Sequence, residues 1–155
     1  FPSESLFTNL LKMKSLLLVL LMSFTSVMYA QNHVKWTFKY NAKSSTVIAT
    51  GEIEPGWHLY SQKTDENAGP IPTKMVIEAS KNYKIVGAAV EGTVPHEIFD
   101  KNFESTVYLF EEHYAAEQQI NVKKPGTLKG EMQYMICDDT KCLPPISVPF
   151  TLEIN

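Results

Sequence analysis

The sequence contains no arginine, because all 14 of its basic residues are lysine. Acidic residues outnumber them, with 17 Asp and Glu, so the chain carries a formal charge of −3. Proteins that bind nucleic acid use dense clusters of basic side chains to neutralise phosphates, and arginine is prominent among them. A mildly acidic chain without arginine therefore argues against nucleic acid as a partner.

Long apolar runs are also scarce, and the one that is present covers residues 16–24. It follows a short basic region and leads to small residues ending at Ala30, which is the order of parts in a secretory signal peptide. The run is too short for a stable membrane anchor. We therefore predict an upstream extension at residues 1–12, a signal peptide at 13–30 and one exported domain at 31–155.

After residue 30 the sequence has no helical apolar stripe, internal repeat or low-complexity tract. Apolar and polar residues instead alternate, as they do along a strand with one buried face. Alternating stretches lie at residues 34–40, 47–53, 106–110, 128–136 and 146–154. Proline and glycine separate many of them. Short strands at this spacing predict an all-β protein, specifically an immunoglobulin-like β-sandwich.

Cysteine is rare as well: the chain has only Cys137 and Cys142, in the stretch YMICDDTKCLPP. Disulfides form and persist in exported proteins, so the two residues can pair. Residues 138–141 are typical of a turn, and residues facing each other across a hairpin lie within disulfide range. A Cys137–Cys142 disulfide across a β-hairpin is therefore feasible.

One interpretation of the pair is a structural bridge. The closed ring is so short that it contributes about 2 kcal/mol in the chain-entropy account, against ~3 kcal/mol for a fifteen-residue loop. Apolar residues of the preceding strand occupy even positions up to Ile136, so Cys137 is expected on the opposite face from the core residues. Both observations weaken this interpretation, and a non-catalytic immunoglobulin-like binding module with a structural disulfide remains an alternative.

Other interpretations concern redox chemistry and metals. A thioredoxin site requires Cys-x-x-Cys at a helix N-terminus, which this spacing and these flanks do not provide. The four histidines are scattered singly along the chain, which does not fit a zinc site. A Cu(I) site of Met135 and the two cysteines is chemically possible, because all three ligands are soft. A periplasmic copper-binding domain is therefore a further alternative.

The remaining interpretation is a thiol–disulfide exchange pair on a hairpin. Exchange requires a thiolate that can attack an accessible disulfide in line. Lys141 beside Cys142 would lower the pKa of that thiol, whereas Asp138 and Asp139 beside Cys137 would raise the other. Cys142 is thus expected to be the better nucleophile.

Three stretches carry a family resemblance. YMICDDTKCLPP resembles the cysteine hairpin of the N-terminal periplasmic domain of the thiol:disulfide interchange protein DsbD, where Cys-loop-Cys precedes an apolar or aromatic residue and Pro-Pro. IEPGWHLYSQ, residues 53–62, is similar to the family's Gly-aromatic-x-Leu-Tyr strand, and VPHEIFDKNF, residues 94–103, stands in the place of its acidic-aromatic cap loop. The resemblance covers residues 33–154. The family's best-known members have five residues between the cysteines, whereas this chain has four.

The resemblance implies roles for six residues. Cys137 and Cys142 would be the redox pair on a hairpin inserted in the immunoglobulin-like sandwich. Phe99, with Glu97 nearby, would cap the disulfide until a partner displaces it. Tyr60 and Trp57 would be aromatic neighbours of the site. Ordinary core packing is the alternative for the three aromatic residues.

The resemblance also implies partners and a compartment. Reducing equivalents would come from a thioredoxin-like domain fed by a membrane-embedded thiol reductase. They would pass to periplasmic thioredoxin-fold acceptors, such as disulfide isomerases or cytochrome c maturation proteins. No cofactor is required, because the dithiol itself carries the two electrons.

Overall fold

The computed structural model describes residues 33–155, which form one compact unit. The predicted upstream extension and signal peptide lie outside the described residues. Within residues 33–155 the regular structure is almost entirely strand, and no helix there is long and apolar enough to cross a membrane. In chain order the elements are β1 (Val34–Asn41), β2 (Thr46–Ile53), β3 (His58–Tyr60), the 3-10 turn η1 (Glu66–Ala68), β4 (Lys74–Ile77), β5 (Tyr83–Glu91), β6 (His96–Asp100), β7 (Ser105–Phe110), β8 (His113–Val122), β9 (Gly126–Tyr134), β10 (Ile136–Cys137) and β11 (Ile146–Ile154).

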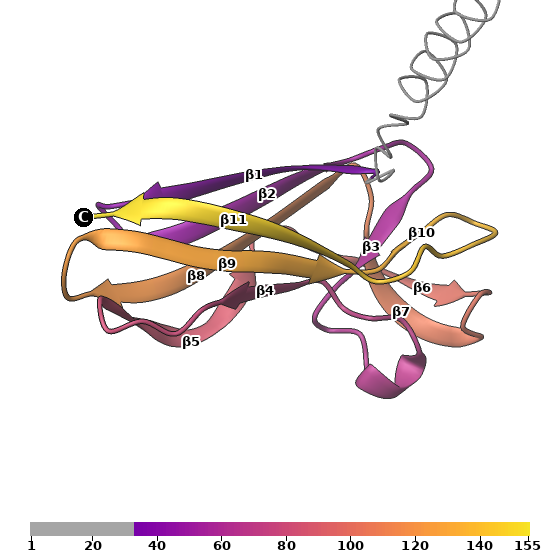
Figure 1. Ribbon diagram of the computed structural model, residues 1–155. Coiled ribbons are helices and arrows are strands. Elements are labelled where there is room, and N and C mark those ends of the chain that lie inside the picture. The colour runs from indigo at the N-terminus through magenta and orange to yellow at the C-terminus, as the bar shows by residue number, and fades with distance from the viewer. Residues whose placement is uncertain (1–32) are drawn as a thin grey trace, which may run out of the picture. The chain divides into compact units, whose positions relative to one another are not determined.

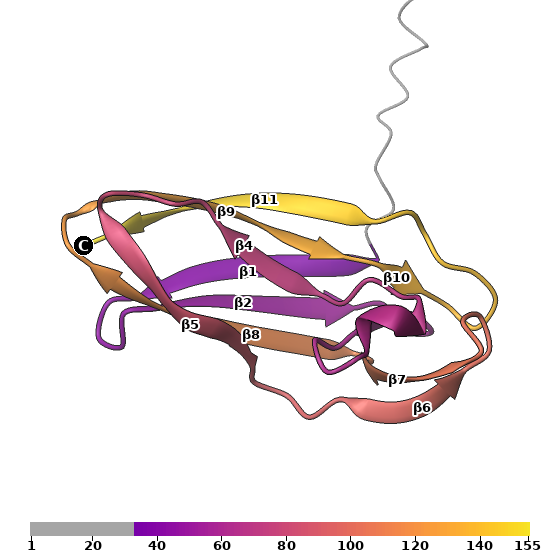
Figure 2. The ribbon, with the colours of Figure 1, turned by 90° about the horizontal axis from the view of Figure 1, so that it is seen from below.

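Two antiparallel sheets form a sandwich, and a third extends it at one end. The sandwich sheets have the strand orders β1-β2-β8-β5 and β11-β9-β4, and the end sheet has the order β10-β3-β7-β6. Figures 1 and 2 show the end sheet at the opposite end of the domain from the C-terminus. The predicted all-β, immunoglobulin-like sandwich is confirmed.

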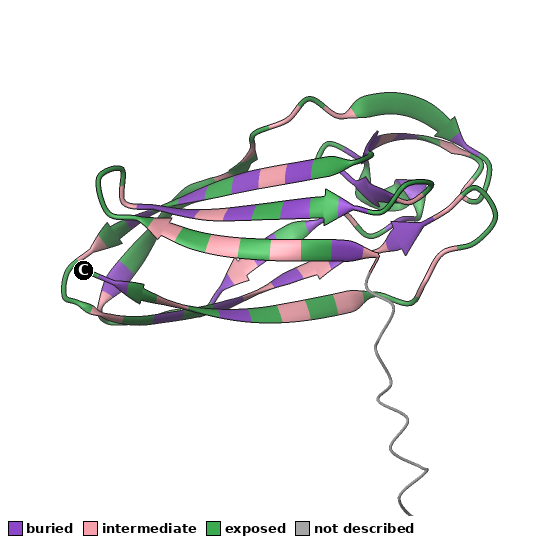
Figure 3. Ribbon diagram, turned by 90° about the horizontal axis from the view of Figure 1, so that it is seen from above, coloured by how far each residue is buried: buried purple, intermediate pink, exposed green. Residues whose placement is uncertain are grey.

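Side-chain alternation builds the main core between the two sandwich sheets. On β9, Leu128, Met132 and Tyr134 are fully buried, and Lys129, Glu131 and Gln133, which alternate with the buried row, are exposed or partly exposed. Figure 3 shows this banding of buried and exposed residues along the strands. Gly130 belongs to the same buried row, where a Cβ atom would come within 2.6 Å of a backbone oxygen and 2.7 Å of the Phe150 ring. Glycine at this position therefore allows β9 to pack closely against its neighbours.

All five alternating stretches form strands, β1, β2, β7, β9 and β11, but the fourth is divided. β9 ends at Tyr134, and after Met135 the chain continues as β10 in the end sheet. Since β9 pairs with β11 and β10 pairs with β3, the chain changes sheet just before the first cysteine. This change places the cysteine stretch in the end sheet.

The end sheet separates the main core from a second, smaller one. Leu59, Phe110 and Ile136 lie on the face that joins the main core. The other face carries a buried cluster, here called the small core, consisting of Tyr60, Ala68, Val107, Leu109 and Cys137. The first cysteine is therefore part of the second core.

Candidate functional site

The two cysteines face each other across a tight hairpin. Cys137 and Cys142 form an antiparallel bridge and are joined by a disulfide. Below them, the Leu143 amide donates to the Ile136 carbonyl at 2.9 Å, and above them the Asp138 amide donates to the Lys141 carbonyl at 2.9 Å. The hairpin disulfide that the sequence allows is therefore present, with residues 138–141 forming the turn between the two cysteines.

The Asp138 carboxylate shapes the tip of this hairpin. Its Oδ1 accepts hydrogen bonds from the Thr140 amide at 2.8 Å, the Thr140 hydroxyl at 2.9 Å and the Lys141 amide at 2.8 Å. These hydrogen bonds, those from Thr140 first, lower the pKa of Asp138. A short aspartate side chain that accepts from amides two and three residues ahead is a standard way to close a turn. Asp138 therefore stabilises the turn that connects the two cysteines.

Burial distinguishes the two sulfurs. Cys137 is 0% exposed and belongs to the small core, whereas Cys142 is half-buried at its edge. Cys137 does lie on the opposite face from Ile136, as the alternation of the strand predicts. That face is not open to solvent, however, because the small core covers it. A partner approaching from solvent therefore reaches Cys142 first.

A chain of buried polar groups lies beside the pair. In the β10–β3 register, Cys137 is directly opposite His58. His58 Nε2 lies 3.1 Å from the Tyr60 hydroxyl, which donates to Asp100 Oδ2 at 2.6 Å. The Asp100 Oδ2 atom is also 3.9 Å from His58 Nε2. All three side chains are at least nine-tenths buried, so β3 and β6 together place an imidazole, a phenol and a carboxylate next to the disulfide.

The charges in this chain follow from burial. Burial lowers the pKa of His58, although the nearby carboxylates of Asp100, Glu111, Asp139 and Asp138 oppose that shift. Burial also raises the pKa of Tyr60, and the hydrogen bond to Asp100 adds to the increase. At neutral pH Tyr60 is therefore a neutral hydrogen-bond donor, and His58 is an uncharged imidazole.

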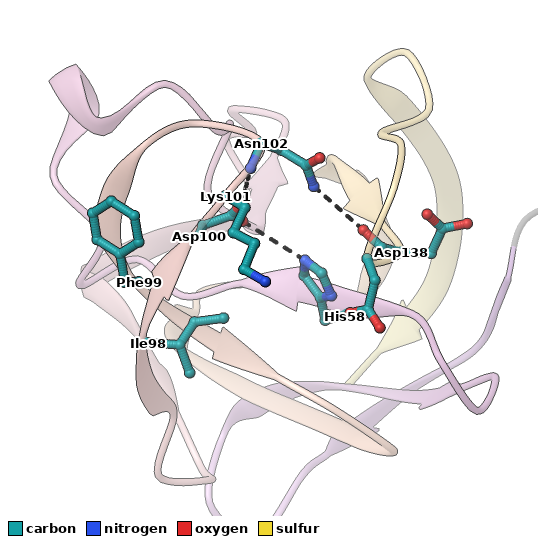
Figure 4. Close-up of a pocket in the computed structure, with 8 residues that line it drawn as sticks. His58, Ile98, Phe99, Asp100, Lys101, Asn102 and Asp138 are labelled. Carbon is teal, nitrogen blue, oxygen red and sulfur yellow. Dashed lines mark hydrogen bonds and ion pairs between the residues drawn. The ribbon is translucent and has the colours of Figure 1, made fainter.

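A cavity of about 270 Å³ opens onto these groups. Figure 4 shows His58 between Asp100 of β6 on one side and Asp138 of the cysteine hairpin on the other. Eight residues line it: His58, Ile98, Phe99, Asp100, Lys101, Asn102, Asp138 and Asp139. The His58 side chain is therefore reachable from solvent although it is largely buried.

Phe99 and Glu97, the expected cap residues, are not part of the small core that contains Cys137. In the β6–β7 register Ile98 is opposite Val107 of the small core, so Phe99 projects from the other face of β6. Phe99 is 64% exposed and turns away from His58 (Figure 4). The Glu97 carboxylate accepts a hydrogen bond from the Tyr108 hydroxyl at 2.6 Å on that same outer face. The alternation of β6 therefore places both residues outside the small core.

Phe103, for which the sequence predicted no role, packs against the small core instead. Its ring meets that of Tyr60 edge-on, with 5.9 Å between ring centroids. A Cβ atom on Gly69 would lie 2.4 Å from the Phe103 ring, so the positive-φ glycine after η1 leaves space for it. In the same β6–β7 turn, the Asn102 side chain donates to the Asp138 carbonyl at 3.3 Å. The β6–β7 turn and the cysteine hairpin are thus joined at their tips.

The two expected aromatic neighbours occupy different positions. Tyr60 is in the small core with Cys137, so it is a direct component of the site. Trp57 is half-buried and stacks on His33 with 3.7 Å between ring centroids. The Lys141 ammonium lies 5.8 Å from the Trp57 centroid, close enough for a cation–π contact with the hairpin. Trp57 therefore supports the hairpin from outside the small core.

Comparison with known families identifies this arrangement. The sequence profile described as "Thiol:disulfide interchange protein DsbD, N-terminal" matches residues 27–153, which is most of the chain. The chain belongs to the DsbD N-terminal domain family. A search of curated proteins finds no significant match. Among residues 33–155, no group of three or more His, Cys, Asp or Glu side chains is arranged to hold a metal ion.

Solved structures agree with membership of the DsbD N-terminal family. The chain is 14% identical to the reduced DsbD N-terminal domain of Neisseria meningitidis, with a TM-score of 0.58, covering 83% of this chain and 95% of that one. It is 13% identical to the same domain in complex with the PilB N-terminal domain, with a TM-score of 0.58, covering 82% of this chain and 88% of that one. It is 16% identical to the N-terminal periplasmic domain of ScsB from Proteus mirabilis, with a TM-score of 0.52, covering 82% of this chain and 48% of that one. At these identities the likeness establishes the fold.

Proposed function

We propose that this domain exchanges thiols and disulfides with partner proteins through Cys137 and Cys142 in an exported, periplasmic setting. The observation that carries the proposal is the hairpin disulfide, which has one sulfur at the surface and one in the small core. Family membership supports it, and so does the complex that a related N-terminal domain forms with the PilB N-terminal domain.

The half-buried cysteine is the one that meets the partner. In the reduced protein, the Cys142 thiolate attacks a partner disulfide, forms a mixed disulfide and releases one partner thiolate. Cys137 then attacks Cys142, which re-forms the internal disulfide and releases the second partner thiolate. Two electrons move from the cysteine pair to the partner, and no further cofactor takes part. The electron donors and acceptors of this cycle are a membrane-linked thiol reductase and thioredoxin-like proteins.

The reduction potential of the pair tests the exchange function. We expect a value above about −300 mV, because structural disulfides of secreted proteins typically have reduction potentials below that limit. The measurement is equilibration with glutathione redox buffers, followed by mass spectrometry of the alkylated protein. A value well below this limit would identify a structural bridge and support the binding-module alternative.

We assign to the β6–β7 turn the role of covering the disulfide, which the resemblance gives to Phe99. Phe103 packs against the small core, and Asn102 of the same turn contacts the hairpin. Displacing this turn would expose the inner side of the disulfide to a partner. Phe103 is therefore the cap residue in this proposal, and Phe99, on the outer face of β6, is available to contact a partner.

Phe103→Ala should make the disulfide more reactive toward small thiols. Removing the ring opens the small core, and we expect roughly tenfold faster reduction by dithiothreitol, because access governs exchange rates. Phe99→Ala is the matched control, since it removes an equal ring from the other face of β6. The rates are measured by stopped-flow tryptophan fluorescence. Acceleration by Phe99→Ala instead of Phe103→Ala would return the cap to Phe99.

A further inference from the structure

We infer that His58 accepts the proton of the Cys137 thiol when Cys137 closes the internal disulfide. This inference rests on the proposed exchange function and assigns a role in it to a residue outside the cysteine hairpin. Across one face of the end sheet, Cys137 has Cys142 on one side and His58 on the other. Cross-strand neighbours of this kind have Cβ atoms about 4.5–5.5 Å apart, within reach of an imidazole.

Cys137 needs such a group more than Cys142 does. Its sulfur is fully buried, and burial in apolar surroundings raises a thiol pKa. Only the thiolate attacks a disulfide, so the buried thiol must lose its proton before the mixed disulfide can resolve. Water reaches the half-buried Cys142, whereas the small core surrounds Cys137. A neighbouring base is the chemical means to ionise it.

Within residues 33–155, the hydrogen bonds around His58 leave one ring nitrogen without a partner and available for this task. Tyr60 uses its proton toward Asp100, so toward His58 its oxygen can only accept. The proton of neutral His58 is therefore on Nε2, and Nδ1 carries a lone pair. In Figure 4 the nitrogen that is not directed at Asp100 faces the hairpin that carries Asp138.

The surroundings also accommodate the positive charge that His58 would acquire. Asp100 Oδ2 lies 3.9 Å from Nε2, on β6. Glu111, which follows β7, and Asp138 and Asp139 of the hairpin also favour the protonated ring, while burial disfavours it. Lys101 lines the same cavity and adds positive charge at its rim. These opposing effects keep the imidazole uncharged at neutral pH and allow it to be protonated transiently.

The step balances in protons and electrons. Cys142 begins as a mixed disulfide with the partner, and Cys137 as a thiol. His58 Nδ1 takes the proton, the Cys137 sulfur donates an electron pair to Cys142, and the bond between Cys142 and the partner breaks. The partner leaves as a thiolate. Its proton is restored from His58 through the cavity that opens to solvent.

The test separates attack from resolution, with glutathione disulfide as the probe. Reduced protein is mixed with it between pH 5 and 9, and acid-quenched samples are analysed by mass spectrometry for the mixed disulfide and the closed disulfide. In the wild type, resolution should rise with pH through an inflection below the ordinary thiol pKa, since neutral His58 is the base. In His58→Gln, resolution at pH 7 should fall roughly tenfold, and its inflection should move up by about one pH unit or more.

His96→Gln is the matched control, because it replaces an exposed histidine on β6 of the same sheet. It should leave the profile of resolution as in the wild type. A His58→Gln profile that follows the wild type within about twofold would overturn the inference. Wild-type protein that forms neither the mixed disulfide nor the closed disulfide would instead contradict the exchange function itself, so the two failures are distinguishable.

Tyr60→Phe provides a second variant if His58→Gln does not fold. It keeps the ring in the small core and removes the hydroxyl that links His58 to Asp100. Without that link the proton of His58 can shift to Nδ1, so resolution should slow in the same direction. The inference is overturned if the pH profile of resolution is unchanged in Tyr60→Phe and the wild-type profile has its inflection at the ordinary thiol pKa.

Discussion

Cys137→Ser should stop turnover and leave the partner covalently attached to Cys142. The half-buried Cys142 can still attack a partner disulfide, but no second thiol remains to displace the partner. We expect a persistent mixed disulfide and a fall in turnover of roughly 100-fold or more, to the rate at which external thiols release the partner. Non-reducing gel electrophoresis and mass spectrometry with a thioredoxin-like partner measure both quantities.

Cys142→Ser is the control that makes this result specific. It leaves one cysteine as well, but that cysteine is 0% exposed in the small core. It should therefore lose turnover without accumulating the adduct. Equal trapping by both variants would show that the difference in burial does not decide which sulfur meets the partner. Stronger trapping by Cys142→Ser would reverse the assignment of attacking and resolving residues.

The cysteine hairpin could be predicted because its signals are local. Two cysteines, a turn sequence between them and an alternating strand before them are all contiguous in the chain. The opposite facing of Ile136 and Cys137 also follows from the two-residue period of a strand. What the alternation could not show is that the other face has its own cover, because the small core is drawn from β3, η1 and β7.

The sequence pattern did not predict β5 and β8, for a different physical reason in each strand. β5 is exposed along most of its length, so it has no one-sided apolar pattern. β8 alternates in burial, but one of its inward positions is Gln118, whose side chain is 5% exposed and donates to the Val86 carbonyl at 3.0 Å. A hydrogen-bonded polar residue in a core position hides the pattern of the strand from any count of apolar residues.

The cap assignment depended on a similar ambiguity. Phe99 and Phe103 stand four residues apart in one stretch, and both are plausible covers for a disulfide. The choice between them follows from the β6–β7 register and from the space at Gly69, which belongs to a different part of the chain. His58 was partly predictable, because it stands two residues before Tyr60 and so shares its face. The approach of Asp100 from β6 was not.

The stability of the fold should depend on the main core far more than on the disulfide. Leu128 is 0% exposed in the central strand β9, and Leu128→Ala should lower the free energy of unfolding by roughly 2–5 kcal/mol through lost burial and the cavity left behind. Reduction of the disulfide should cost about 2 kcal/mol at most, because it opens only a very short ring. Urea unfolding of oxidised, reduced and Leu128→Ala protein measures these differences.

Lys129→Ala is the control for this comparison, since Lys129 is the next residue on β9 and is exposed. It should change the unfolding free energy by no more than about 0.5 kcal/mol. A smaller loss of stability on reduction than in Leu128→Ala matters for the exchange function, because a carrier that alternates between dithiol and disulfide must remain folded in both states. Neither cysteine belongs to the main core between the sandwich sheets, so that core is built without them. If reduction lowered stability as much as Leu128→Ala, the bond would be a structural element and not a reversible carrier of electrons.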